Sequence, residues 1–344
     1  MLGRGHTSTS PSLTKLASRL YLKKYTGGGV GGTGMQTLGK HRTLGFAAAF
    51  LASCFWGCGF YFGKIALNEM SVGAMVFYRF VFATIGLLPL LLTHRPRFNA
   101  AEWRLLLLAA FLGVPLQFIY QFKGLALTTV SHAALMVGMM PVILAVGATL
   151  FAHERLSKLG WAALTLSTTG AALIAFGGHG ASGTHNTTAG GPTLTGDLLV
   201  ILSLFIALFW ILFNQRLMKR HSHIVVTAYG IVTGTVMLVI YVPFAYGPPP
   251  IHGISLKAWA ALAASGLLCT ATTTLLWNWG MTQVPASQAG VLLNMEPLIG
   301  SLLGVLLLHE HLGPLAWLGG AMILTAAIAL TTHSTTPIED PAMI

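Results

Sequence analysis

Ten long apolar segments constrain this chain more than any other feature. A helix needs about 20 apolar residues to cross the roughly 30 Å hydrocarbon core of a bilayer. The ten segments lie near residues 44–66, 71–93, 103–122, 129–151, 158–177, 197–215, 224–246, 258–279, 286–308 and 314–332. Only 8% of the 344 residues are charged, against about 25% in a soluble domain. The sequence therefore predicts an all-α integral membrane protein with ten transmembrane helices.

The basic residues predict how these helices are oriented. Fifteen of the 19 Lys and Arg residues lie before residue 43 or in the connections 93–104, 152–158 and 216–221. Because cytoplasmic loops of membrane proteins carry an excess of Lys and Arg, we expect both termini to be cytoplasmic. The net charge of +11 does not indicate nucleic-acid binding, since the basic residues flank apolar segments instead of forming one surface.

Three further stretches contain no spanning segment. Residues 1–43 mix Ser, Thr, Gly and basic residues and are predicted to form a disordered cytoplasmic tail. They lack the short apolar core of a cleaved signal peptide, and Met35 is an alternative start of the protein. Residues 178–196 are predicted to be a polar extracytoplasmic linker, and residues 333–344 a cytoplasmic C-terminal tail.

An internal repeat divides the apolar part into two halves. Shifting the chain by 156 residues places 131–161 over 287–317, with 11 of 31 positions identical and no gap. The identical positions include a proline, a His-Glu pair and a tryptophan. We therefore expect one five-helix repeat over residues 44–177 and a second over residues 197–332.

An odd number of helices in each repeat places the two copies in opposite orientations across the membrane. The charges agree, because the basic residues of the 152–158 loop have no basic counterpart in the second copy. Pro141 and Pro297 occupy equivalent positions and predict a kink in each copy. Inverted repeats around a site near the midplane are typical of secondary transporters that work by alternating access.

Five motifs are spaced along the apolar segments. They are WGCGFYFGK (56–64), YRF (78–80), the P…HERLS stretch that ends the fourth segment, GD (196–197) and MEPLIG…LLLHEHL in the ninth segment. Together they resemble the drug/metabolite transporter superfamily, specifically its ten-helix EamA-type carriers. The resemblance covers residues 44–332 and implies a bacterial inner-membrane carrier of small metabolites, with helices 1–4 and 6–9 around a central cavity. We expect export of amino acids or related compounds, and a small-molecule substrate and the lipid bilayer as partners.

Glu296 is the only acidic or basic residue between Lys257 and His309. A carboxylate near the middle of a membrane helix costs several kcal/mol unless it faces a cavity or a partner, or takes up a proton. One interpretation is therefore that Glu296 binds a substrate ammonium group or carries a coupling proton. The other is that it forms a structural hydrogen bond beside Pro297. The corresponding residue of the first repeat is Met140, so the charge belongs to one copy only.

Arg79, in the second helix, is the other charged candidate. Its guanidinium can hold a substrate carboxylate with two parallel hydrogen bonds. It can equally pair with a carboxylate of the protein or extend toward the headgroups. Further candidates for the substrate site are aromatic or polar residues within the apolar segments, namely Trp56, Tyr78, Trp277, Asn294 and His132. Glu154 and Glu310 end their helices and are interpreted as loop anchors.

The sequence agrees less well with three functions other than small-molecule transport. A lipid or lipid-linked-sugar flippase shares the broader superfamily but more naturally uses a shorter four-helix chain. A non-transporting membrane scaffold has no need of charged groups within the bilayer, which Arg79 and Glu296 supply. The His-Glu pairs lack the H-E-x-x-H spacing of a zinc hydrolase, and there is no P-loop for ATP. We expect no enzyme, and no cofactor or metal.

Overall fold

The computed structural model describes residues 33–94, 96–151, 158–177, 192–283 and 292–333. These residues form helices and no strands, which confirms the predicted all-α class. Residues 1–44 and residues 45–344 form two units, and the packing described below is that of the second. Residues 178–191 of the predicted linker, Glu154 and the C-terminal tail beyond residue 333 lie outside the described residues. The last three residues of the predicted linker, 194–196, belong to helix α9 (Leu194–Met218).

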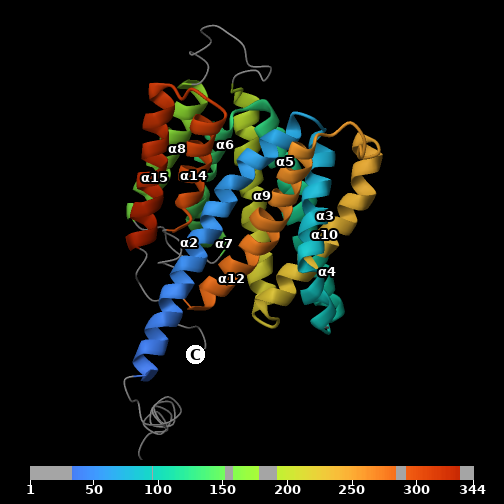
Figure 1. Ribbon diagram of the computed structural model, residues 1–344. Coiled ribbons are helices and arrows are strands. Elements are labelled where there is room, and N and C mark those ends of the chain that lie inside the picture. Colours follow the sequence, from blue (N-terminus) through green and yellow to red (C-terminus); the bar gives the residue numbers. More distant parts are fainter. Residues whose placement is uncertain (1–32, 95, 152–157, 178–191, 284–291, 334–344) are drawn as a thin grey trace, which may run out of the picture. The chain divides into compact units, whose positions relative to one another are not determined.

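The helices follow one another without any other regular structure between them in the described ranges (Figure 1). The first half contains α2 (Thr33–Leu67), α3 (Val72–Thr93), α4 (Ala100–Phe111), α5 (Gln117–Leu127), α6 (Val130–Val137), α7 (Met140–Phe151) and α8 (Lys158–Gly177). The second half contains α9 (Leu194–Met218), α10 (His223–Tyr246), α11 (Leu256–Gly266), α12 (Thr273–Gln283), α14 (Met295–Leu307) and α15 (Pro314–His333). α2 thus begins earlier than predicted, inside the segment expected to be a tail.

Six stretches of the described chain are long and apolar enough to cross a membrane. They are Thr43–Leu67, Val72–Thr93, Ala100–Leu127, Leu194–Met218, His223–Tyr246 and Leu256–Gly280. Each coincides with a predicted segment. For the other four predicted segments, membrane spanning stays a prediction. One of them, 129–151, is divided between the short helices α6 and α7.

Polar residues at the helix starts explain where several helices begin. The side chains of Ser71, Ser222 and Ser255 each accept a hydrogen bond from the backbone N–H three residues further on. Asn99 and Glu102 form a reciprocal capping box at the start of α4. Such caps satisfy backbone donors that have no partner within the helix.

The helices are interrupted at equivalent positions of the two repeats. A π-helical segment η1 (Leu112–Leu116) separates α4 from α5, and η3 (Leu267–Thr272) separates α11 from α12, in register with the 156-residue shift. α6 ends at Val137, four residues before Pro141, and a turn at Leu293 precedes Pro297 by the same spacing. A proline removes the hydrogen bond to the carbonyl four residues earlier, so both predicted kinks are confirmed as breaks.

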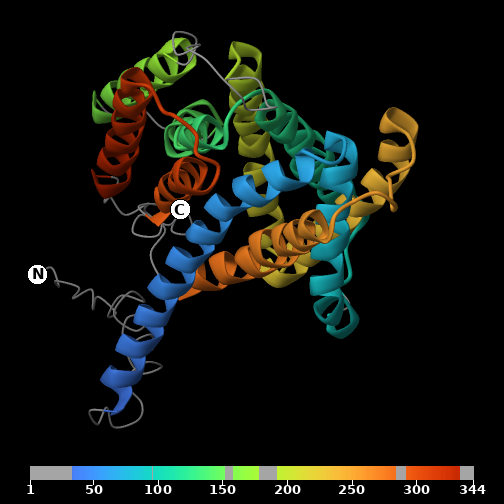
Figure 2. The same cartoon turned by 45° about the horizontal axis from the view of Figure 1, so that its top comes forward.

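Two pairs of equivalent helices from the two halves pack against each other, and α6 also lies beside α14. α3 lies beside α10 and α8 beside α15, and the α8–α15 pair stands at one edge of the bundle in both views (Figures 1 and 2). α8 and α15 meet through Gly170 and Gly319. A Cβ atom on Gly170 would lie 2.6 Å from the carbonyl oxygen of Gly319, so only glycine allows this approach of two backbones.

Apolar side chains cover the outside, and polar groups bond between helices inside. Phe244 is 94% exposed and Ile240 72% exposed, as expected for residues that face lipid. The hydroxyl groups of Thr84 and Thr235 lie 2.9 Å apart between α3 and α10, and Asn278 Nδ2 donates to Thr227 Oγ1 at 2.7 Å. These contacts satisfy polar groups that hydrocarbon cannot.

Candidate functional site

The π-helical segment η3 provides the surroundings of Arg79. In a π-helical turn the hydrogen bonds run over five residues instead of four. The hydroxyl groups of Thr270 and Thr273 follow the same spacing, since they donate to the carbonyls of Ser265 and Leu268 at 2.9 and 2.6 Å. Arg79 Nε in turn donates to Thr270 Oγ1 at 2.9 Å. This hydrogen bond ties α3 to η3, the interruption between α11 and α12.

The Arg79 guanidinium is buried among aromatic rings. Arg79 is 4% exposed, and its Cζ lies 4.8 Å from the ring centre of Phe118 and 5.2 Å from that of Phe122. Its Nη2 donates to the carbonyl of Cys269 at 3.4 Å. Such burial is incompatible with a side chain that extends to the headgroups. Among the described residues no carboxylate lies within 4.0 Å of it, so N–H donors remain for a ligand.

Glu296 is the second residue of α14 and follows directly on the turn before it. Its side chain is half-buried and takes part in no ion pair within 4.0 Å among the described residues. α2 passes close to both residues, because a Cβ atom on Gly57 would lie 2.6 Å from the carbonyl oxygen of Glu296 and one on Gly59 would lie 3.7 Å from Arg79 Nη1. The Arg79 and Glu296 side chains form no ion pair within 4.0 Å among the described residues.

Two of the tryptophans predicted to line the substrate site contact each other. The rings of Trp56 on α2 and Trp277 on α12 lie 5.4 Å apart with their planes tilted by 54°, and both are half-buried. Asn294 is 2% exposed and occupies the turn two residues before Glu296. Trp56 is the neighbour of Gly57, which lies against Glu296, and Trp277 joins this group through its contact with Trp56.

Tyr78 and His132 lie in other surroundings. The Tyr78 hydroxyl donates to the carbonyl of Pro250 at 3.0 Å, and its ring packs edge-on against Trp259 at 4.8 Å. Tyr78 thus anchors the connection after α10. His132 is 2% exposed, and its Nδ1 lies 3.6 Å from Asp197 Oδ2. Within the described ranges, neither side chain forms an ion pair with Glu296 or a hydrogen bond with Arg79.

The surroundings of His132 belong to a buried polar network that the sequence did not predict. Lys64, at the end of α2, donates from Nζ to the carbonyls of Leu125 and Thr128 at 2.8 and 2.7 Å. The Thr128 hydroxyl donates to Asp197 Oδ1 at 2.7 Å. Asp197 is fully buried. We call Lys64, Thr128, His132, Asp197 and Glu310 the end network.

Glu310 ties the α14–α15 connection to the start of α6. Its carboxylate accepts from the backbone N–H groups of Val130 and Ser131, each at 2.8 Å, and from the Ser131 hydroxyl at 2.6 Å. An anion at a helix N-terminus satisfies unpaired donors and the helix dipole together. The predicted loop anchor is confirmed for Glu310.

Lys64 and Asp197 of the end network lie at the ends of apolar segments, within the motifs WGCGFYFGK and GD. A charged side chain at the end of an apolar segment usually reaches water, so the sequence pattern does not indicate that Lys64 and Asp197 are buried. Among the described residues no group of three His, Cys, Asp or Glu side chains is arranged to hold a metal ion.

Comparison with known proteins places this architecture in a family. The model of the EamA-like transporter family matches residues 43–176 and again residues 194–332. The chain belongs to the EamA-like transporter family. This membership, together with the apolar helices, makes it a membrane transporter, in agreement with the resemblance found in the sequence.

Individual proteins resemble this family member along most of its length. An uncharacterized transporter of Archaeoglobus fulgidus is 26% identical over 82% of this chain and 95% of its own. The inner membrane protein YtfF of Escherichia coli is 26% identical over 84% of this chain and 95% of its own. A solved crystal structure shares the fold with a TM-score of 0.58 and 16% identity, over 85% of this chain and 98% of that one.

Proposed function

We propose that this EamA family member is a secondary transporter that moves a small zwitterionic metabolite, such as an amino acid, by alternating access. Export is the proposed direction. The substrate site is proposed to lie between the repeats around Arg79 and Glu296, with Trp56, Trp277 and Asn294 beside them. In this proposal all ten apolar segments cross the membrane, in two inverted repeats over residues 44–177 and 197–332.

The observation that carries this proposal is that Arg79 and Glu296, a basic and an acidic residue, both lie against α2 and form no ion pair with each other among the described residues. An amino acid presents a carboxylate and an ammonium group, which complement a guanidinium and a carboxylate respectively. Arg79 is held by Thr270 and by two aromatic rings, so its geometry is set before a ligand arrives. Charged groups within a membrane bundle mark substrate or ion pathways. Glu296 is also the proposed carrier of a coupling proton.

The end network supports alternating access. Its contacts join α2, α5, α6, α9 and the α14–α15 connection. These elements come from both repeats, so their contacts must break when that end opens. We propose that the end network closes the substrate pathway at one side of the membrane. The name of the Escherichia coli relative and the basic connections support a plasma-membrane location with both termini in the cytoplasm.

The decisive experiment is a ligand screen followed by flux measurement. Purified protein is heated with each of the common amino acids, and a ligand that binds the folded state raises its unfolding temperature. A stabilising amino acid is then offered to proteoliposomes under a pH gradient, and accumulation is expected. Translocation of a fluorescent phospholipid without flux of any small metabolite would instead favour a flippase.

A further inference from the structure

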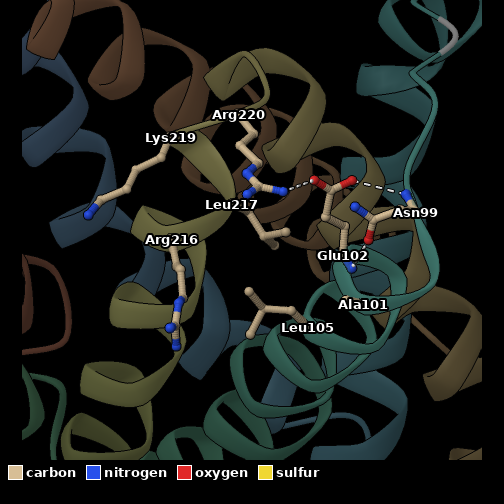
Figure 3. A pocket seen from close by; sticks show the side chains of 8 residues that line it. All are labelled: Asn99, Ala101, Glu102, Leu105, Arg216, Leu217, Lys219 and Arg220. Atoms are coloured by element: carbon tan, nitrogen blue, oxygen red, sulfur yellow. Dashed lines mark hydrogen bonds and ion pairs between the residues drawn. The ribbon is translucent and has the colours of Figure 1, made fainter.

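A basic pocket lies where α9 ends and α4 begins, away from the proposed substrate site. It has a volume of about 330 Å³, and its walls include Arg216, Lys219 and Arg220 on one side and Glu102 and Leu105 on the other (Figure 3). Leu217, which is 2% exposed, contributes to its apolar floor. The pocket thus combines cationic and apolar surfaces.

The positive charges of the pocket are only partly neutralised. Arg220 Nη1 lies 3.5 Å from Glu102 Oε1, and the Glu102 carboxylate also accepts from the backbone N–H of Asn99 at 2.9 Å. Figure 3 shows the Arg220 side chain turned toward Glu102, whereas the side chains of Arg216 and Lys219 point away from Glu102. Arg216 and Lys219 are exposed and have no acidic partner among the described residues. The pocket therefore keeps an excess of positive charge.

Neighbouring aromatic residues indicate the depth of the pocket in the membrane. One apolar span ends at Met218 and another begins at Ala100, so the pocket is level with the ends of two spans. Trp103 is 40% exposed and packs against Phe98 at 5.3 Å between ring centres. Tryptophan and tyrosine gather at the headgroup level of bilayers. Leu108, one turn beyond Leu105 on α4, is 46% exposed and continues the apolar surface toward the hydrocarbon.

We propose that this pocket binds the phosphate of an anionic glycerophospholipid, with Arg216 and Lys219 as its ligands and an acyl chain along the apolar face of α4. A guanidinium matches two phosphate oxygens, and an ammonium adds a point charge. The apolar side chains of Leu105 and Leu217 favour a lipid over a free anion, because an acyl chain can pack against them and an inorganic anion cannot. The inference rests on the proposed function only in that the helices span a bilayer.

The test measures lipid binding to delipidated full-length protein in detergent by native mass spectrometry. Phosphatidylglycerol, phosphatidylcholine and inorganic phosphate are titrated separately. Wild-type protein is expected to prefer phosphatidylglycerol, and the double variant Arg216→Gln/Lys219→Gln is expected to lose about tenfold or more in that affinity. The matched control Lys123→Gln/Lys257→Gln removes two exposed cations elsewhere and is expected to leave the preference intact.

Three other outcomes of the lipid titration would contradict the proposal. Equal binding of the two lipids, or equal losses in the test and control variants, would show that the pocket is not a specific lipid site. Inorganic phosphate that binds as tightly as phosphatidylglycerol would show a free-anion site. Flux in proteoliposomes is recorded in parallel, so selective lipid binding without amino-acid flux contradicts the transporter proposal alone.

Discussion

Arg79 on α3 donates a hydrogen bond from Nε to the hydroxyl of Thr270, 191 residues away, at the π-helical interruption of the eighth helix. The same threonine donates to the carbonyl of Ser265. Thr270 is therefore the link between an irregular backbone and a buried guanidinium.

The first prediction concerns the shape of the Arg79 group. Arg79→Lys keeps the charge but loses the planar fork and the stacking on Phe118, so the KM for a carboxylate-bearing substrate should rise about tenfold or more. Thr270→Val, which removes the acceptor, should act in the same direction. Thr270→Ser keeps the hydroxyl and serves as the control. An unchanged KM in Arg79→Lys would remove Arg79 from the substrate site.

The second prediction separates coupling from binding at Glu296. Glu296→Gln cannot release a proton, so accumulation driven by a pH gradient should be abolished while counterflow exchange of substrate persists. Both fluxes are measured in proteoliposomes with labelled substrate. Glu69→Gln, which neutralises a carboxylate at a helix connection, should leave both fluxes near wild type. Gradient-driven accumulation by Glu296→Gln would refute the coupling role.

The third prediction tests the close contact of α8 and α15. Gly170→Ala places a methyl group against the carbonyl of Gly319, so overpacking should lower the free energy of unfolding by about 1–3 kcal/mol. The control is Gly230→Ala, because no atom lies within 4 Å of a Cβ added at Gly230. That change should be neutral or stabilising by up to about 1 kcal/mol. Equal unfolding temperatures for the two variants would contradict the packing.

The fourth prediction concerns the end network as a gate. Lys64→Met leaves the carbonyls of Leu125 and Thr128 without their donor, which should weaken the closed end. Ser131→Cys, in protein whose native cysteines are replaced, reports this opening through its rate of labelling by a membrane-impermeant maleimide. Labelling should be faster with Lys64→Met than without it, whereas the exposed control Lys257→Met should change nothing. An unchanged rate would show that the network does not close the pathway.

The fifth prediction is a pH dependence at the α2–α3 connection. Glu69 Oε1 accepts from the Ser255 hydroxyl at 2.6 Å and Oε2 from the Ser255 backbone N–H at 2.7 Å. These hydrogen bonds, the side-chain one first, hold the pKa of Glu69 below its ordinary value. The stabilisation is therefore complete above the ordinary carboxyl pKa and is lost as the pH falls through the lower folded value.

Thermal unfolding between pH 7 and pH 3 measures this contribution. Glu69→Gln should lower the unfolding temperature of the protein at neutral pH and remove part of the acid-induced loss. At the acid end the variant and the wild type should converge. A constant difference at every pH would show that the Glu69 charge does not support the contact with Ser255.

The helices and their interruptions could largely be predicted because they depend on local pattern. Spans of about 20 apolar residues have one low-energy solution in a bilayer, and prolines break a helix at a set spacing. The two π-helical segments were missed, since no proline shared between them marks the place: η1 contains Pro115, whereas η3 has none. Their equivalence appears only when the repeat shift is applied to the observed backbone.

The candidate site was only partly within reach of the sequence. Arg79 and Glu296 stood out because each is a charge within an apolar segment, whatever its neighbours. The residues that contact them could not be predicted, because a helical pattern gives the spacing along one helix and not the rotation of one helix against another. Tyr78 and Arg79 are adjacent in sequence, yet one bonds to the connection after α10 and the other to η3.

The class of the protein follows from composition, length and spacing along the chain, which predict apolar helices, an internal repeat, its breaks and two ionisable residues within apolar segments. The contacts between distant residues follow from the packing of the helices. They include Arg79 with Thr270, His132 with Asp197, and Lys64 with the carbonyl of Leu125 in α5. Such contacts join residues that lie far apart along the chain, and helix packing selects them through close glycine approaches that no single segment encodes.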